Sequence, residues 1–360
     1  MSQRRSAIAS IVAAAVVCST GIASLAAQKK DDKKQDEAQK KEALAIFKLV
    51  DDVMAGTAQP TNDLGLAWLH EDFLKAQGNK EFVPFIVTLD STKITPNTPS
   101  LSFYWRVVSK DAAPPPAPDP NAKKDDKNKD KNKAPAKTEY PWEDLHVLPV
   151  APGQSGPTRI TRSFTVPAGA YEVYIVAREP TSQAKNAPAP KTSVLKQTVN
   201  VPDYWNGELA TSSVIMASRL DPLAAPLTPQ QLSERPYAMG AMEIVPQVEL
   251  NFSKKGELQP VFMVYNPKLD SASKPDVTIE YNFYSKPSGA PEKFFNHTSP
   301  QNFNAQTMPQ FDAAAGHQIP GGIAIPLSSF PEGDYRLEIK ITDKIATKTI
   351  TRDVNFTVSS

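Results

Sequence analysis

One short phrase occurs twice in this chain and constrains its fold more than any other feature. Residues 167–171 read Pro-Ala-Gly-Ala-Tyr, and residues 331–335 read Pro-Glu-Gly-Asp-Tyr. Each copy leads into a run of alternating apolar and polar residues, and each is followed one hairpin later by a Val-Asn pair, at 199–200 and 354–355. Because an internal repeat reflects a repeated structural unit, the sequence predicts two related β-modules in tandem.

The glycine and the tyrosine of each copy have a structural interpretation. Gly169 and Gly333 stand at a turn, and Tyr171 and Tyr335 open the strand that follows. In the tyrosine corner of a β-sandwich, a tyrosine at this place donates its hydroxyl to the backbone a few residues upstream. We therefore predict that these four residues hold the fold together and do not form a functional site.

The first 27 residues have the features of a secretory signal peptide. Arg4 and Arg5 form a basic start, residues 8–17 are almost entirely apolar, and small residues near Ala26 and Ala27 suit signal peptidase. The apolar run is short for a transmembrane helix, and a charged segment follows it. The sequence predicts export to the periplasm or the extracellular space, with retention as an uncleaved anchor left open.

Cys18 is the one cysteine of the chain. A lipoprotein signal requires a small residue before that cysteine, and Val17 stands there instead, so lipidation is disfavoured. Removal of the signal peptide would leave no thiol, and stability would then depend on hydrophobic cores. The 40 basic and 39 acidic side chains nearly balance, which argues against a nucleic-acid or anionic-membrane partner. No later segment is apolar enough to span a membrane.

Three segments lie outside the predicted strands. Residues 28–42 are rich in lysine and acidic residues, and their composition predicts a charged, disordered tail. Residues 43–79 are predicted to be helical, because apolar residues recur at helical spacing and Gly56 provides a stop between two short helices. Residues 111–138 contain a proline run and a Lys/Asp/Asn tract, so a disordered insert is predicted there.

The first module is predicted to be a β-sandwich at residues 80–202. Trp105 is predicted to be its buried core tryptophan, and Pro84 is predicted to place its strand at a sheet edge. Its six predicted strands begin at Glu81 and then occupy residues 101–108, 145–150, 158–166, 171–178 and 193–201.

The second module is predicted at residues 203–360, after a linker at 202–207. A helical turn is predicted within the Pro-rich crossing at 221–236, and a hairpin turn at 253–256. Its predicted strands are residues 212–217, 241–250, 257–265, 277–284, 322–327, 335–342 and 347–358. The sequence thus predicts an all-β chain: two tandem immunoglobulin-like or fibronectin-like β-sandwiches preceded by a short helical N-terminal segment.

Several phrases resemble a known family. Tyr-Ala-Met-Gly at 237–240, Val-Phe-Met-Val-Tyr-Asn at 261–266 and the second Pro-x-Gly-x-Tyr copy are similar to the β-sandwich region of secreted bacterial proteins of the GWxTD-domain or von Willebrand factor A-related type. Residues 73–76 with 83–85 resemble the start of the preceding module in those proteins. The resemblance implies architecture and export. Neither the Gly-Trp-x-Thr-Asp motif nor the Asp-x-Ser-x-Ser metal-adhesion motif occurs, so no site residue carries over.

Residue types that commonly carry chemistry are present without a recognisable arrangement. The four histidines are scattered, and none forms a His-x-x-x-His pair. The Gly-Gln-Ser-Gly-Pro phrase at 153–157 lacks the acidic residue of a serine-protease nucleophile loop and is typical of a turn. We therefore predict no catalytic, cofactor-binding or metal-binding residues and no cofactor. Carboxylates paired across strands, as in a glycoside hydrolase, remain an alternative.

Aromatic residues in the predicted loops have two interpretations. Trp142, Tyr204 and Trp205 are tentative ligand contacts, because exposed rings of this kind stack on sugars. The interpretation that we favour is that they plug the junction between the modules or cap the ends of a sandwich. The function predicted from the sequence is an exported, non-catalytic interaction or scaffold protein whose partner is an envelope protein or a polysaccharide. A carbohydrate- or peptidoglycan-binding module and a hydrolase with strand-borne carboxylates are the alternatives.

Overall fold

The computed structural model of the chain describes residues 22–111, 139–182, 184, 186–225 and 227–360. Most of the predicted signal peptide and almost all of the predicted insert at 111–138 lie outside these residues. The chain divides into two compact units, Met1–Ala58 and Gln59–Ser360, and each is described by itself.

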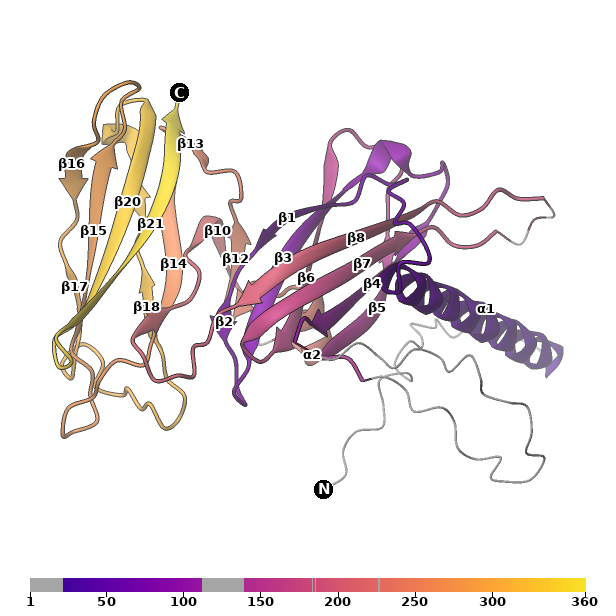
Figure 1. Cartoon of the computed structure of the whole chain (residues 1–360), viewed down its shortest axis with the longest axis horizontal. Helices are drawn as coiled ribbons and strands as arrows, with labels where there is room; N and C mark the ends of the chain where they lie inside the picture. The colour runs from indigo at the N-terminus through magenta and orange to yellow at the C-terminus, as the bar shows by residue number, and fades with distance from the viewer. Residues whose placement is uncertain (1–21, 112–138, 183, 185, 226) are drawn as a thin grey trace. The chain divides into compact units, whose positions relative to one another are not determined.

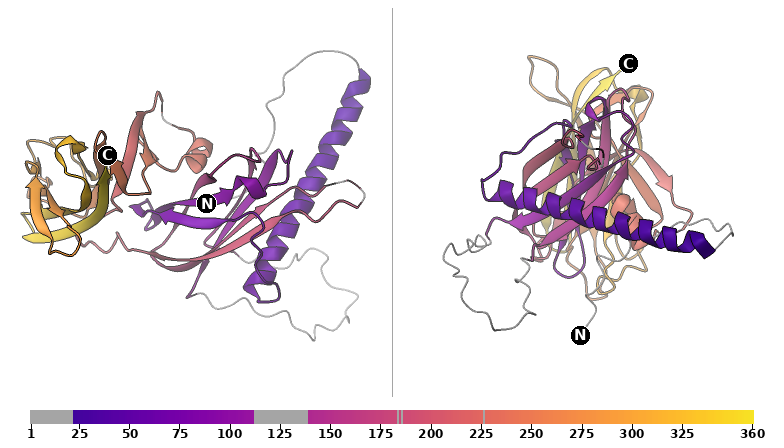
Figure 2. Two further views of the ribbon diagram at one scale, coloured as in Figure 1. Left: turned by 90° about the horizontal axis from the view of Figure 1, so that it is seen from above. Right: turned by 90° about the vertical axis from the view of Figure 1, so that its right-hand side faces the viewer.

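The first unit contains a long helix, α1 (Ile22–Met54), which Figure 2 shows as one unbroken indigo helix. Gly56 follows its end with a φ of +70°, as expected of a helix stop. The prediction of a disordered tail at 28–42 is wrong, because α1 runs through it. Lysine, glutamate, glutamine and alanine are strong helix formers, and opposite charges four residues apart attract, as Lys48 and Asp52 do at 2.6 Å.

The predicted helical segment 43–79 is helical only as far as α1 extends. The predicted second helix is wrong, because its residues form two short strands, β1 (Ala67–Glu71) and β2 (Leu74–Lys75). Both pair antiparallel with β3 (Glu81–Asp90). Apolar residues four apart suit alternate positions of a strand as well as one face of a helix, and pairing with β3 decides between the two.

The prediction that Pro84 places its strand at a sheet edge is also wrong. β3 is central, with β6 (Pro157–Val166) on one side and β1 and β2 on the other. Between β1 and β2, the amide of Asp72 donates to the carbonyl of Pro84 at 3.0 Å. The amide and the carbonyl of a strand residue point to the same side of the strand. The side on which Pro84 lacks an N–H therefore faces the gap between β1 and β2, where the ladder is interrupted.

All six strands predicted for the first sandwich are present. Besides β3 and β6 they are β4 (Ser100–Ser109), β5 (Trp142–Pro149), β7 (Gly169–Arg178) and β8 (Thr192–Val201). The sheet β5-β4-β7-β8 faces the sheet formed by β6, β3, β1 and β2, and a 3₁₀ turn (Ser91–Lys93) follows β3 (Figure 1). Trp105 is 1% exposed in the core between them, as predicted, and its indole N–H donates to Ser163 O at 3.1 Å.

The second sandwich also has two sheets, coloured from rose to yellow in Figure 1. One sheet contains β9 (Ala210–Thr211), β10 (Ile215–Pro222), β11 (Ala238–Met239), β12 (Met242–Pro246), β14 (Glu257–Tyr265), β18 (Ile319–Gly322) and β19 (Ile325–Pro326). The other, in the order β13-β21-β20-β15-β16 with β17 also beside β15, contains β13 (Asn251–Ser253), β15 (Val277–Ser285), β16 (Lys293–His297), β17 (Gln301–Phe303), β20 (Gly333–Asp343) and β21 (Lys348–Ser359). The predicted helical turn is α2 (Pro229–Glu234), and a 3₁₀ turn (Leu327–Ser329) precedes β20.

Several features of the second sandwich differ from the prediction. A turn occurs at 253–256, where the Gly256 amide donates to Ser253 O at 2.8 Å, but its flanking strands do not pair as a hairpin. Instead β13 runs parallel to β21 in one sheet while β14 belongs to the other, so the turn carries the chain across the sandwich. The edge strands β16 and β17 were not predicted, because their residues show no alternation that distinguishes them from a loop.

Each copy of the repeated phrase forms the same corner. The hydroxyl of Tyr171 donates to the carbonyl of Pro167 at 2.8 Å, and the hydroxyl of Tyr335 donates to that of Pro331 at 2.7 Å. The glycine between the proline and the tyrosine has a φ of +151° in the first copy and +145° in the second, a conformation that residues other than glycine rarely adopt. Both tyrosines are at most 5% exposed, so their rings also fill the two cores.

The two sandwiches share an apolar junction. Its buried side chains are Leu74, Ile86, Ile215, Ala217, Tyr237 and Ile244. Hydrogen bonds cross it as well: Tyr237 donates to the buried Asp72 carboxylate at 2.7 Å, and the Phe73 amide donates to Ser213 Oγ at 2.9 Å. The second unit therefore joins its sandwiches through side-chain packing and not through the 202–207 linker alone.

Candidate functional site

The outer face of the six-stranded sheet carries polar side chains in ordered rows. Along β20, Leu337 and its alternate neighbours are buried in the core, and Arg336 and its alternate neighbours point away from it. Antiparallel register places Tyr284 of β15, Arg336 and Asn355 of β21 side by side. We call this surface of β15, β20, β21 and β16 the outer face.

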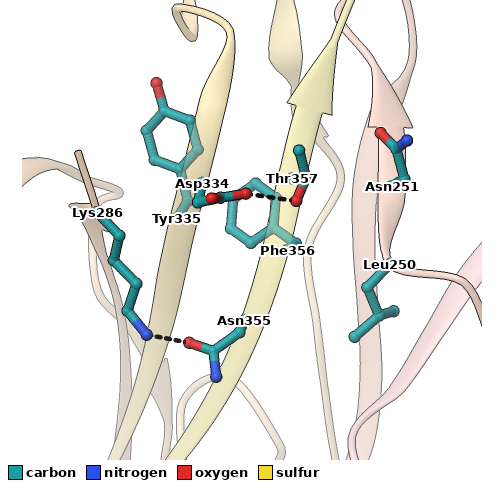
Figure 3. Close-up of a pocket in the computed structure, with 8 residues that line it drawn as sticks. All are labelled: Leu250, Asn251, Lys286, Asp334, Tyr335, Asn355, Phe356 and Thr357. Carbon is teal, nitrogen blue, oxygen red and sulfur yellow. Dashed lines mark hydrogen bonds between the residues drawn. The ribbon is translucent and has the colours of Figure 1, made fainter. Parts of the chain in front are cut away.

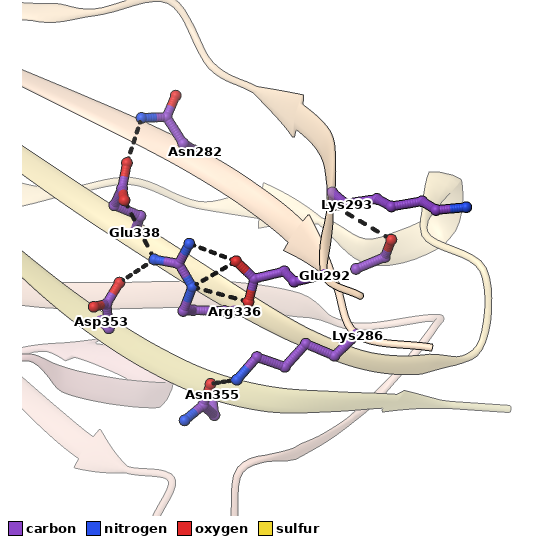
Figure 4. Close-up of polar contacts among 9 residues, drawn as sticks. Asn282, Lys286, Glu292, Lys293, Arg336, Glu338, Asp353 and Asn355 are labelled. Atoms are coloured by element: carbon purple, nitrogen blue, oxygen red, sulfur yellow. Dashed lines mark hydrogen bonds and ion pairs between the residues drawn. The ribbon is translucent and has the colours of Figure 1, made fainter. Parts of the chain in front are cut away.

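Arg336 is the centre of the outer face (Figure 4). Its guanidinium bonds both carboxylate oxygens of Glu292, with a closest contact of 2.7 Å, and reaches Asp353 at 2.5 Å and Glu338 at 3.3 Å. It also lies over the ring of Tyr284, 4.3 Å from its centroid. These hydrogen bonds raise the pKa of Arg336 and lower the pKa of Glu292. The arginine thereby holds three carboxylates and one ring in fixed positions.

A shallow hollow of about 470 Å³ adjoins this cluster (Figure 3). Lys286 donates to Asn355 Oδ1 at 2.5 Å, and Thr357 donates to Asp334 at 2.6 Å, so the polar groups at the hollow are oriented by one another. Asn355 stands in the same cross-strand row as Arg336, which makes the hollow and the arginine cluster one continuous surface. The hollow is lined by Leu250, Asn251, Lys286, Asp334, Tyr335, Asn355, Phe356 and Thr357.

An exposed aromatic ring completes the outer face. Phe294 of β16 is 58% exposed, and its ring packs edge-on against Tyr284 with centroids 5.8 Å apart. The next residue, Phe295, turns the other way and packs on Phe330 in the core, with centroids 4.9 Å apart. The Phe-Phe pair thus supplies one core side chain and one ring to the surface.

The aromatics proposed from the sequence as ligand contacts are differently placed. Trp142 opens β5 and packs against the first core, with its indole N–H buried and lacking a hydrogen-bond partner among the described residues. Tyr204 is 6% exposed and packs on Tyr265 at the junction. Trp205 is 40% exposed, and Lys75 covers its ring 4.2 Å from the centroid. Tyr204 therefore plugs the junction, and the three rings form no common platform.

The described residues contain no group of three His, Cys, Asp or Glu side chains that could hold a metal ion. His70 lies 3.1 Å from Asp72 and His146 lies 3.1 Å from Asp144. Three carboxylates of the outer face converge around Arg336, which lowers the pKa of Glu292. A glycosidase acid needs the opposite shift, a raised pKa.

Sequence reasoning missed the residues of the outer face. The alternation along residues 335–342 places Arg336 and Glu338 on the solvent side, but it does not show which side chains lie across from them. That information is the register of β15, β20 and β21 together with the course of the loop before β16, and it brings Glu292, Arg336 and Asp353 together from segments far apart in the chain. The adjacent phenylalanines were the one visible signal, because two large apolar residues in succession cannot both face the core of a strand.

Comparison with known proteins gives no family for this chain. No protein-family model matches the sequence, and no curated protein matches it. Among solved structures, the native conformation of Escherichia coli alpha-2-macroglobulin is similar at 9% identity over 84% of this chain and 15% of that chain, with a TM-score of 0.21. A mutant Salmonella alpha-2-macroglobulin gives 10% identity over 83% and 17%, with a TM-score of 0.18. The structure titled pT26-6p gives 9% identity over 82% and 66%, with a TM-score of 0.19.

This chain spans less than a fifth of the length of either macroglobulin. Similarities with TM-scores this low say nothing about the function of this chain. What the fold itself establishes is the class: an all-β protein with two β-sandwiches and an N-terminal helix. No helix among the described residues is long and apolar enough to cross a membrane.

Proposed function

We propose that this chain is an exported, non-catalytic interaction protein, and that its partner docks on the outer face of the second sandwich. The signal-like residues 1–27 support export. The junction between the sandwiches supports a scaffold role, because it presents both modules as one body.

The observation that carries the proposal is the fixed arrangement around Arg336 beside the exposed Phe294 ring. Binding surfaces commonly combine an aromatic anchor with polar groups that are held in place before the partner arrives. Arg336 provides that order, because Glu292, Asp353 and Tyr284 are all held by one guanidinium. An ordered surface loses less side-chain entropy on binding than a mobile one.

The same arrangement supports binding without catalysis at the outer face. Hydrolysis of a glycoside there would require one carboxyl group that keeps its proton near neutral pH. The pKa of Glu292 is instead lowered by its hydrogen bonds to Arg336. The guanidinium also occupies the space between the carboxylates, where a glycosidic bond would have to lie.

The test is capture of a partner from the cell-envelope fraction by immobilised wild-type protein and by two outer-face variants. Phe294→Ser removes the exposed ring, and Arg336→Met removes the hub. We expect each to weaken binding of the captured partner at least tenfold, which corresponds to about 1.4 kcal/mol. Val147→Ser is the matched control, since Val147 is 53% exposed on β5 of the first sandwich and should bind as wild type does.

Equal affinity of wild type and both outer-face variants would contradict the proposed docking surface. A polysaccharide pull-down in parallel separates the carbohydrate alternative, for which the half-exposed Trp205 is the remaining tryptophan candidate. Retention of wild type with loss in Trp205→Ala, and no loss in Phe294→Ser, would favour a carbohydrate module at the junction over the outer face.

A further inference from the structure

Glu81 is a buried acid at the junction between the sandwiches. It is the first residue of β3, and its side chain is 0% exposed. Its Oε1 accepts the backbone N–H of Tyr204 at 3.0 Å, while Oε2 is buried without a hydrogen-bond partner among the described residues. A buried carboxylate with one such bond is poorly compensated for the water it has lost.

The lysine that faces Glu81 across the ladder is engaged elsewhere. Lys75 lies directly opposite Glu81 across the β2–β3 ladder, but its ammonium donates to Asn266 Oδ1 at 2.8 Å and lies over the Trp205 ring. The backbone amide of Lys75 donates to the hydroxyl of Tyr265 at 3.0 Å. Both contacts join the first sandwich to the second, and a movement of the Lys75 ammonium toward Glu81 would break the contact with Asn266.

Tyr204 ties the linker to both sandwiches. Its N–H is held by Glu81, its carbonyl accepts from Asn266 Nδ2 at 3.0 Å, and its ring packs on Tyr265 with centroids 4.9 Å apart. Glu81 is therefore the first-sandwich end of a chain of contacts that runs through the linker into the second sandwich.

We propose that Glu81 makes this junction respond to pH: when its buried carboxyl loses a proton, the charge draws the Lys75 ammonium away from Trp205 and Asn266 and so breaks its contacts with the linker and the second sandwich. Below the transition the neutral carboxyl accepts the Tyr204 amide and Lys75 keeps its contacts with the second sandwich. Above it the carboxylate competes for the same ammonium. The proposal is independent of the outer face.

The charged surroundings of Glu81 agree with a transition near neutral pH. The pKa of Glu81 is raised to about 7, mainly by burial. The smaller effects, in decreasing order, are the Tyr204 amide, which lowers the pKa, the Asp203 carboxylate, which raises it, and Lys75, which lowers it. The hydroxyls of Tyr204 and Tyr265 also face the site, but burial raises the pKa of both above its usual range, so they stay neutral.

The direction of the pH effect follows from the two states. The pKa of Glu81 is about 7 in the folded chain, above the ordinary value of 4.5, so the folded state binds the proton more tightly than the unfolded state does. The free energy of unfolding therefore falls as the pH rises from about 4.5 to about 7, and this contribution is constant above that range.

The experiment follows tryptophan emission between about pH 5 and 8.5. The emission of Trp205 is obtained as the difference between the spectra of the wild type and of Trp205→Phe. This ring reports on Lys75, because its centroid lies 4.2 Å from the ammonium. We expect the Trp205 emission to follow a one-proton curve with a midpoint near pH 7 in the wild type and to be flat in Glu81→Gln. His70 is the rival source, since its hydrogen bond to Asp72 raises its pKa as well, but its signal would survive in Glu81→Gln.

A second variant keeps the test decisive if Glu81→Gln folds poorly. Asp203→Asn keeps an oxygen for the Trp205 amide, which Asp203 Oδ1 accepts at 2.8 Å, and removes the charge that raises the pKa of Glu81. The midpoint should move to lower pH. No transition in the wild type, a midpoint unmoved by Asp203→Asn, or a transition that persists in Glu81→Gln would each overturn the proposal.

Discussion

At the scale of single residues, the two corner tyrosines allow the contribution of the same hydrogen bond to stability to be measured in each sandwich. Tyr171→Phe and Tyr335→Phe each remove one hydroxyl donor and leave the ring that fills the core. We expect each to lower the free energy of unfolding by about 1 kcal/mol, measured by urea denaturation. Tyr284→Phe is the control, since its hydroxyl has no hydrogen-bond partner within the described part of the chain. Losses no larger than in the control would show that packing alone maintains the corners.

At the scale of secondary-structure elements, the pairing of β14 with β18 depends on one glycine. Gly321 lies opposite Phe262, and a Cβ at Gly321 would stand 2.4 Å from the phenyl ring. Gly321→Ala should therefore cost about 1–3 kcal/mol in the free energy of unfolding, through overpacking. Phe262→Leu supplies the control by making room, so the double variant should lose less than the sum of the two single variants. Additive losses in a double-mutant cycle would contradict the contact.

At the scale of the whole second unit, the junction should make the two sandwiches unfold together. Ile215 is 2% exposed at the junction and is not part of the core of the second sandwich. Ile215→Asn should split one calorimetric transition into two, because a buried amide without a partner costs about 1–3 kcal/mol. Ile341→Val, in the core of the second sandwich, should lower the melting temperature while the transition stays single. A wild type that already melts in two steps would refute the coupling.

The sequence alone determined those parts of the protein that depend on neighbours along the chain. The repeated turn and tyrosine, the alternation along β20 and the buried Trp105 were all predicted, because a period of two and a glycine-dependent turn are local properties. The candidate site was barely visible by the same reasoning. Only the exposed Phe294 left a trace, as one of two successive phenylalanines.

The tertiary structure decided what local patterns leave open. Residues 67–75 became strands because β3 offered them a ladder, and Pro84 could be central because that ladder breaks beside it. Strand register brought Asp353 to Arg336, the loop before β16 brought Glu292 there, and packing between the sandwiches buried Glu81 beside Tyr204. The alternation of side chains is written in the sequence, whereas partners across strands are selected by the free energy of the whole fold, and therefore only the structure reveals them.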